Sequence, residues 1–159
     1  MSASPVTAAP PGLLAPGRVI DFHFNVDHPV NYACRVVRKA RHAGKTVLVF
    51  TRDAARQSRL DLALWTFSAL DFLPHVTLPS PLAGQTPVWL SSAADTAARD
   101  VLLLLDDEAA PDFAQWFPRF ERVIDVVSSD AQDRARARLR FKSYRDAGFA
   151  PQAHEVANP

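Results

Sequence analysis

Three short runs of apolar residues constrain the fold of this chain more than any other feature. They are TVLVF at 46–50, VLLLL at 101–105 and RVIDVVS at 122–128, and segments with helical signals separate them. Strands that are apolar on both faces are typical of parallel sheets covered by helices. Right-handed crossovers then predict an α/β fold, a Rossmann-like three-layer sandwich with a mainly parallel sheet and helices on both faces.

The length and composition indicate one folded domain with two loose ends. The chain has 159 residues, 48% of them hydrophobic, which matches a single domain. We expect a flexible Pro/Ala-rich leader at 1–17, one α/β domain at 18–150 and a flexible tail at 151–159. The net charge of +1 disfavours attraction of the whole protein to nucleic acid, so electrostatic recognition must depend on local clusters.

The single cysteine, Cys34, cannot form an internal disulfide. This agrees with a reducing compartment, and we expect a cytoplasmic protein. Cys34 shares the helical spacing of Ala33 and Val37, which favours a core position over a reactive thiol. The N-terminal segment lacks the basic start and apolar run of a signal peptide, and no apolar stretch approaches the ~20 residues of a membrane span.

The segment 134–149, RARARLRFKSYRDAGF, predicts a basic helix that ends at a glycine. Four of its side chains are spaced to share one helical face: Arg134, Arg138, Phe141 and Arg145. A face that mixes guanidinium groups with aromatic edges suits an anionic, partly apolar partner. A solvated helix face is the alternative interpretation. However, arginines at 134, 136, 138 and 140 exceed what solubility requires, and some should repel one another unless an anion lies between them.

No segment carries a convincing catalytic or cofactor set. Gly44-Lys45-Thr46 and the acidic residues at 106–108 are similar to parts of a phosphate-loop ATPase, but this GKT closes a helix and enters a strand, the reverse of a phosphate loop. The five histidines lack metal-ligand spacing, and no GxSxG sequence occurs. We predict no enzyme activity, cofactor or metal, with a nucleotide-binding enzyme on the same fold as the alternative.

Large apolar residues gather in LALWTFSALDFLP at 62–74, where a predicted helix gives way to a proline-punctuated loop over 71–87. Core packing explains some of them. Loops lie on the surface, however, and aromatic residues there can form a protein-binding hot spot. For Trp65 and Phe72 both interpretations remain open.

Three blocks of the sequence together resemble one protein family. They are AGKTVLVFTRDAARQSRLDLALW at 43–65, DFLPH at 71–75 and VIDVVSSDAQDRARARLRFKSYRDAGF at 123–149. With them the chain resembles the chi subunits of bacterial DNA polymerase III holoenzyme over most of residues 18–150. The resemblance implies a Rossmann-like, non-enzymatic accessory protein of the clamp loader.

The resemblance also implies partners. The family binds the acidic C-terminal tail of single-stranded DNA-binding protein, which ends in phenylalanine, and it binds the psi subunit or, in some bacteria, a helicase-like protein through the same surface. By resemblance, the tail pocket is expected at Val127, Arg134, Arg138 and Phe141. The psi or helicase surface is expected at Trp65 and Phe72. We therefore expect a monomer that enters a heterodimer, with no membrane partner and at most indirect contact with single-stranded DNA.

Two of these positions depart from the usual family residues. Arg134 stands where lysine is common, so the charge is kept. Phe141 stands where tyrosine is frequent, so a hydroxyl is lost. Direct binding of single-stranded DNA by the arginine face is a third hypothesis, which the near-zero net charge disfavours.

Overall fold

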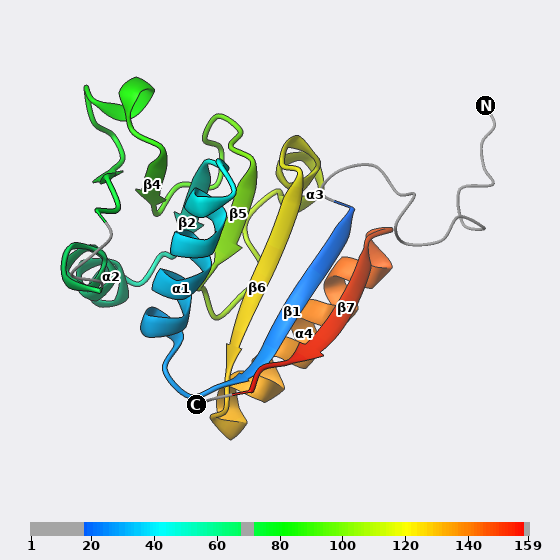
Figure 1. Ribbon diagram of the computed structural model, residues 1–159. Helices are drawn as coiled ribbons and strands as arrows, with labels where there is room; N and C mark the ends of the chain where they lie inside the picture. Colours follow the sequence, from blue (N-terminus) through cyan, green and yellow to red (C-terminus); the bar gives the residue numbers. More distant parts are fainter. Residues whose placement is uncertain (1–17, 68–71, 158–159) are drawn as a thin grey trace, which may run out of the picture.

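The computed structural model describes residues 18–67 and 72–157. Within them, seven strands form one sheet in the order β3-β4-β2-β5-β6-β1-β7, and every pairing is parallel. Helices lie on both faces of this sheet (Figure 1). The predicted α/β three-layer sandwich with a parallel sheet is therefore confirmed. The predicted leader at 1–17 lies outside the described residues.

The strands are β1 (Val19–Val26), β2 (Val47–Phe50), β3 (His75–Thr77), β4 (Val88–Ser91), β5 (Val101–Leu104), β6 (Arg122–Ser128) and β7 (Ala150–Glu155). The helices are α1 (Pro29–His42), α2 (Ala54–Thr66), α3 (Phe113–Trp116) and α4 (Ala131–Asp146), with short 3-10 turns η3 (Ala83–Gln85) and η4 (Phe117–Arg119). All residues of β2, β4 and β5 are buried, which explains the unbroken apolar runs of β2 and β5 and the largely apolar sequence of β4.

Two apolar layers cover the two faces of the sheet. One contains Val37 of α1 and Leu60 of α2, which pack on Val49 and Leu103. The other contains large aromatic side chains from α3, η4 and α4, including Trp116, Phe117 and Tyr144. The helix α4 therefore rests on an aromatic layer, and its outer side is left for charged residues.

Aspartates cap the starts of two helices, and α4 ends at a glycine as the sequence predicts. The Asp53 carboxylate accepts a hydrogen bond from the Arg56 backbone N–H at 3.0 Å and caps α2. Asp130 does the same for Gln132 at 2.9 Å, at the start of α4. Gly148 has a φ of 93° just after α4, a conformation that side chains resist, so the chain can turn there directly into β7.

Two segments differ from the sequence prediction. Residues 150–155, placed in the flexible tail apart from Ala150, form the edge strand β7, which pairs with β1. Residues 75–77, expected in a loop, form the opposite edge strand β3. Each edge strand has one neighbour and is short or poor in apolar residues, so its sequence carries little strand signal.

Cys34 is buried in α1, in agreement with its predicted core position. Burial raises the pKa of its thiol to about 11, so the thiolate is scarce at neutral pH. Among the described residues, no helix combines the length and apolar character that crossing a bilayer requires.

Candidate functional site

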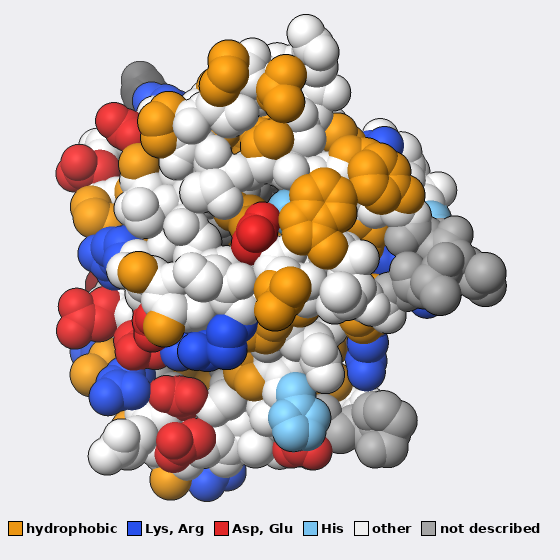
Figure 2. Space-filling view, turned by 90° about the vertical axis from the view of Figure 1, so that its left-hand side faces the viewer, with side chains coloured by type: hydrophobic (Ala, Val, Ile, Leu, Met, Phe, Trp, Pro, Cys, Tyr) orange, Lys and Arg blue, Asp and Glu red, His pale blue; other side chains and the backbone are white. Residues whose placement is uncertain are grey.

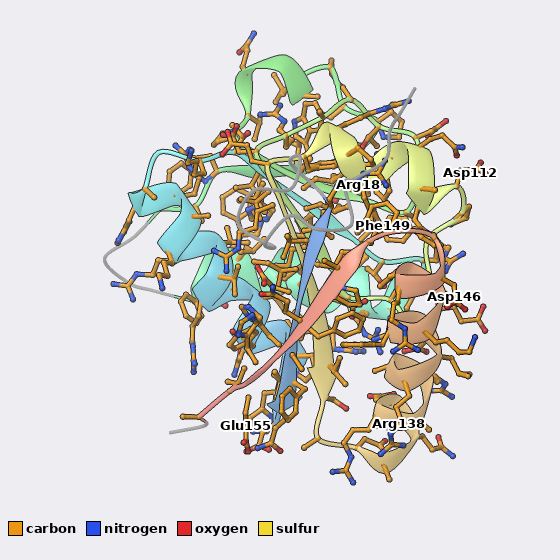
Figure 3. The ribbon with its side chains drawn as sticks, turned by 90° about the vertical axis from the view of Figure 1, so that its right-hand side faces the viewer. Arg18, Asp112, Arg138, Asp146, Phe149 and Glu155 are labelled. Atoms are coloured by element: carbon orange, nitrogen blue, oxygen red, sulfur yellow. The ribbon has the colours of Figure 1, made fainter. Side chains whose placement is uncertain are left out.

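A groove of about 600 Å³ runs between α4 and the edge of the sheet formed by β1 and β7. Figure 3 shows how it opens: β7 and α4 meet at the turn near Phe149 and separate toward Glu155 and Arg138. The lining residues come from β1, β6, α4 and β7: Phe22, Phe24, Val127, Arg134, Ala137, Arg138, Phe141, Lys142, Arg145 and Ala153. All four residues of the predicted tail pocket are among them.

The floor of the groove is apolar. Phe22 and Val127 are buried, and Phe24 and Phe141 pack against the same core while remaining partly accessible. The rings of Phe22 and Phe141 lie with their centroids 5.2 Å apart in a tilted arrangement. These side chains leave an aromatic surface that can receive another ring by edge or offset stacking.

The rim of the groove is cationic. Four basic residues from α4 line it, and no acidic residue of the described ranges does. Lys142 forms a pair with Asp146, their Nζ and Oδ2 atoms lying 2.7 Å apart. Within residues 18–67 and 72–157, Arg134, Arg138 and Arg145 have no carboxylate partner within 4.0 Å. Positive charge without an internal partner is thus concentrated beside an apolar floor.

The remaining arginines of α4 are already paired inside the protein. Arg140 is buried and donates hydrogen bonds to both carboxylate oxygens of Asp125, at 2.9 and 3.0 Å. The hydroxyl of Tyr144 donates a third, at 3.2 Å. Burial raises the pKa of Asp125, and Arg140 opposes that rise. Arg136 lies 3.1 Å from Asp133. The expected repulsion among four arginines is therefore relieved for two of them by internal carboxylates.

A second exposed surface lies near the opposite edge of the sheet, on α2 and the segment before β3. The side chains of Leu62, Trp65 and Phe72 are 66%, 51% and 73% exposed. Figure 2 shows hydrophobic side chains gathered on this face of the molecule. The Trp65 ring lies 5.8 Å from that of Phe72 and 4.3 Å from that of His75. The structure thus places Trp65 and Phe72 together and leaves both accessible.

His75 acts as a structural support for this aromatic surface. It is buried, with Nδ1 2.8 Å from the Leu73 carbonyl oxygen and Nε2 3.0 Å from the Asp61 carboxylate. These contacts hold β3 against α2 and fix the ring on which Trp65 stacks. His75 therefore occupies a structural position.

The carboxyl ends of the strands, where α/β enzymes usually bind nucleotides, are cross-linked by arginines. Arg52 pairs with Asp106, Arg56 donates to the Leu105 carbonyl, and Arg140 donates to the Asp107 carbonyl. The pocket at this edge, which Arg56, Asp106 and Arg140 help to line, holds only about 20 Å³ of space. Gly44 and Lys45 lie at the opposite end of β2, and Lys45 pairs with Glu121 at 3.1 Å. This arrangement does not form a phosphate-binding loop.

Comparison with known proteins shows the family of this chain. The family model described as DNA polymerase III chi subunit, HolC, matches residues 18–152. The chain belongs to this chi subunit family. The DNA polymerase III subunit chi of Pseudomonas aeruginosa is 33% identical over 124 residues, covering 78% of this chain and 84% of that protein. The Escherichia coli subunit chi is 32% identical over 118 residues, covering 73% and 78%. Membership makes the chain a component of the replication machinery.

Solved structures at low identity agree with the fold of this chi-family chain. The Pyrococcus furiosus Hef helicase domain matches with a TM-score of 0.53 and 16% identity, over 70% of this chain and 28% of that one. Saccharomyces cerevisiae Dbp5 matches with a TM-score of 0.60 and 10% identity, over 89% and 42%. The chi-family chain thus spans less than half of each of these longer chains, and the likeness concerns the fold alone.

Sequence reasoning identified part of the groove of this chi-family protein and missed the rest. Val127, Arg134, Arg138 and Phe141 line one groove as the resemblance implied, and Arg145 shares the predicted helix face. Phe22, Phe24 and Ala153 were not predicted. The alternation of RVIDFHF offered a signal for the two phenylalanines, since every second residue of a strand faces the same side. Nothing in the sequence indicated Ala153.

Proposed function

We propose that this protein is a non-catalytic adaptor that binds the acidic C-terminal tail of single-stranded DNA-binding protein in the groove beside α4. The observation that carries the proposal is the meeting of four predicted residues from β6 and α4 in one groove with an aromatic floor and a cationic rim. A terminal phenylalanine and its neighbouring carboxylates offer the complementary chemistry.

The groove suggests a role for each of its parts. The phenylalanine ring would enter beside Val127 and Phe141, where apolar surface is available. The terminal carboxylate would accept hydrogen bonds from the guanidinium of Arg138, whose planar fork fits two oxygens. Arg134 would add positive charge near the terminal carboxylate, and the preceding aspartates would lie along the remaining basic residues of α4. Because these charges are exposed, we expect affinity of about micromolar order that weakens as salt screens them.

The second surface supports the other half of the proposal, a link to the clamp loader. Trp65 and Phe72 form an exposed aromatic pair, and Leu62 on the same helix as Trp65 is exposed too; such apolar side chains can anchor protein interfaces. It would receive the psi subunit or a helicase-like partner. Since α2 packs against β3 and β4 while α4 packs against β6 and β7, the two surfaces lie far apart along the sheet (Figure 1). One protein could then hold both partners at once.

The test is calorimetric titration with a peptide that ends in Asp-Phe, at low and raised salt. We expect binding that weakens with salt, and a loss of at least about tenfold in affinity for Arg138→Ala, because a charge-assisted pair is removed. The same peptide with an amidated C-terminus should lose affinity to a similar degree. Undiminished binding by Arg138→Ala would contradict the proposal.

Arg136→Ala is the matched control. Arg136 lies on the same helix and is exposed, but it pairs with Asp133 and does not line the groove. Its substitution removes the same net charge from the protein and should leave peptide affinity within about twofold of wild type. Equal losses of peptide affinity in Arg136→Ala and Arg138→Ala would indicate that the peptide is attracted to the overall positive charge of the helix and not to the groove. Displacement of the peptide by single-stranded DNA would show that the groove also takes nucleic acid.

A further inference from the structure

Among the described residues no strand pairs with the outer edge of β7, which forms one side of the groove beside α4; a role for this edge rests on the proposed tail binding. We propose that the residues preceding the terminal phenylalanine pair with this edge as an added parallel strand. The groove would then recognise the peptide backbone as well as its charges, by strand addition to the sheet.

The hydrogen bonds of β7 show which backbone groups are available. Ala150 donates its N–H to the Arg18 carbonyl at 2.8 Å, and Val156 donates to the Phe24 carbonyl at 3.0 Å. In a strand the N–H and C=O of one residue point to the same side, and successive residues alternate. Residues 150, 152, 154 and 156 therefore face β1. Pro151, Ala153 and Glu155 direct their backbone groups away from the sheet.

Ala153 lies where this free edge meets the groove. It is opposite Phe22 in the β1–β7 register, and both residues line the groove. Its side chain is a single methyl group, so a peptide can pass over it with the terminal ring on the aromatic floor. Its N–H and C=O, together with the Pro151 carbonyl, then offer one donor and two acceptors to the peptide backbone.

The charges of α4 favour a peptide in this position and set its direction. Arg138, Lys142 and Arg145 all line the groove. Seven residues of helix span about 10 Å, the length of about three residues of extended peptide. With its carboxylate at Arg138, the peptide would thus place its preceding acidic residues beside Lys142 and Arg145. The N-terminal side of the peptide would then lie toward the turn near Phe149. Its N-to-C direction would match that of β7, so the two strands would be parallel (Figure 3).

The same edge also carries features that discourage other strands. Pro151 lacks an N–H at an outward position, so it cannot donate to a neighbouring strand. Glu155 places a carboxylate near the far end, within reach of Asn25 at 3.4 Å. Proline and charge at an edge reduce pairing between copies of a protein. A short peptide held by the arginines of α4 needs only the stretch around Ala153.

The experiment measures peptide affinity for wild type, Arg138→Ala, Ala153→Pro and Ala153→Gly, with melting temperature as the check on folding. Because the Ala153 N–H faces away from β1, proline there should spare the β1–β7 hydrogen bonds. We expect binding by Ala153→Pro to be about tenfold weaker than by Ala153→Gly, which lacks the methyl group but keeps the N–H. Binding by Ala153→Pro as tight as wild type would overturn the inference.

A second series changes the peptide and does not depend on the folding of any variant. Single N-methylation of successive backbone amides should weaken binding about three- to tenfold at alternate positions and spare those between, as strand pairing requires. If the peptide tolerated N-methylation at every position, strand addition would be overturned. The proposed function would still stand if Arg138→Ala lost binding. Failure of the unmodified peptide to bind wild type would overturn both.

Discussion

Arg138 and Arg140 lie two residues apart on α4, yet their surroundings differ completely. Arg140 is buried and neutralised by Asp125, whereas Arg138 is exposed on the groove rim without a carboxylate partner among the described residues. Two steps along a helix rotate a side chain by about 200°, which places them on opposite sides. The comparison teaches that the charge available to a partner is the part that the fold leaves unpaired.

The largest effect is expected for substitution of Arg140, the buried arginine of this pair. Arg140→Ala would leave the Asp125 carboxylate buried without its cation, and we expect a loss of about 3–5 kcal/mol in the free energy of unfolding. Urea denaturation followed by circular dichroism measures it. Arg138→Ala should stay within about 0.5 kcal/mol of wild type. Similar stability of the two variants would refute the assignment of Arg140 as a structural residue.

A smaller effect, on peptide affinity, is expected for a conservative substitution of Arg138, the exposed arginine. Arg138→Lys keeps the charge but loses the planar fork that holds two carboxylate oxygens. Peptide affinity should fall about fivefold, less than in Arg138→Ala, as measured by titration at one salt concentration. If lysine binds as well as arginine, the groove senses charge alone and does not hold the terminal carboxylate by a bidentate contact.

Phe141→Tyr tests the position that departs from the usual family residue. The ring would keep its packing on Phe22, and the added hydroxyl would lie at the groove, where it could donate to a peptide oxygen. We expect up to about threefold tighter binding of the Asp-Phe peptide, by the same titration. Weaker binding would indicate that the hydroxyl intrudes on the space needed by the terminal ring.

The smallest effect is expected at the far surface. Trp65→Ala removes an exposed ring beside Phe72 and His75, far from the groove. Affinity for the tail peptide should remain within about twofold of wild type, while capture of a psi or helicase-like partner should be lost in a pull-down assay. A marked change in peptide affinity would mean that the two surfaces are coupled.

The architecture could be predicted because its signals are local. The runs at 46–50 and 101–105 have the composition of buried parallel strands, and Asp53 and Asp130 mark the helix starts by neighbouring contacts. The shared face of α4 followed from helical spacing. The sequence alone could not show which of its arginines are paired inside the protein and which are exposed, because the carboxylate that pairs with Arg140 lies on β6.

The other wall of the groove could not be predicted for the same reason. It depends on pairing between β1 and β7, whose residues Asn25 and Glu155 are 130 positions apart. Only this pairing brings Ala153 beside Phe22. The segment APQAHE contains a proline and little apolar surface, since an edge strand with an exposed side needs no more, and its composition matches that of a loose end.

The position of β1 has a consequence for synthesis of the protein. It is the first described strand to leave the ribosome, but its neighbours in the sheet are β6 and β7, which are made after residues 121 and 149. Until then Phe22 and Phe24 lack the partners that cover them, a state prone to aggregation. The last described strand thus completes one edge of the sheet and one wall of the groove together, so that a chain truncated before residue 150 would lack both β7 and Ala153.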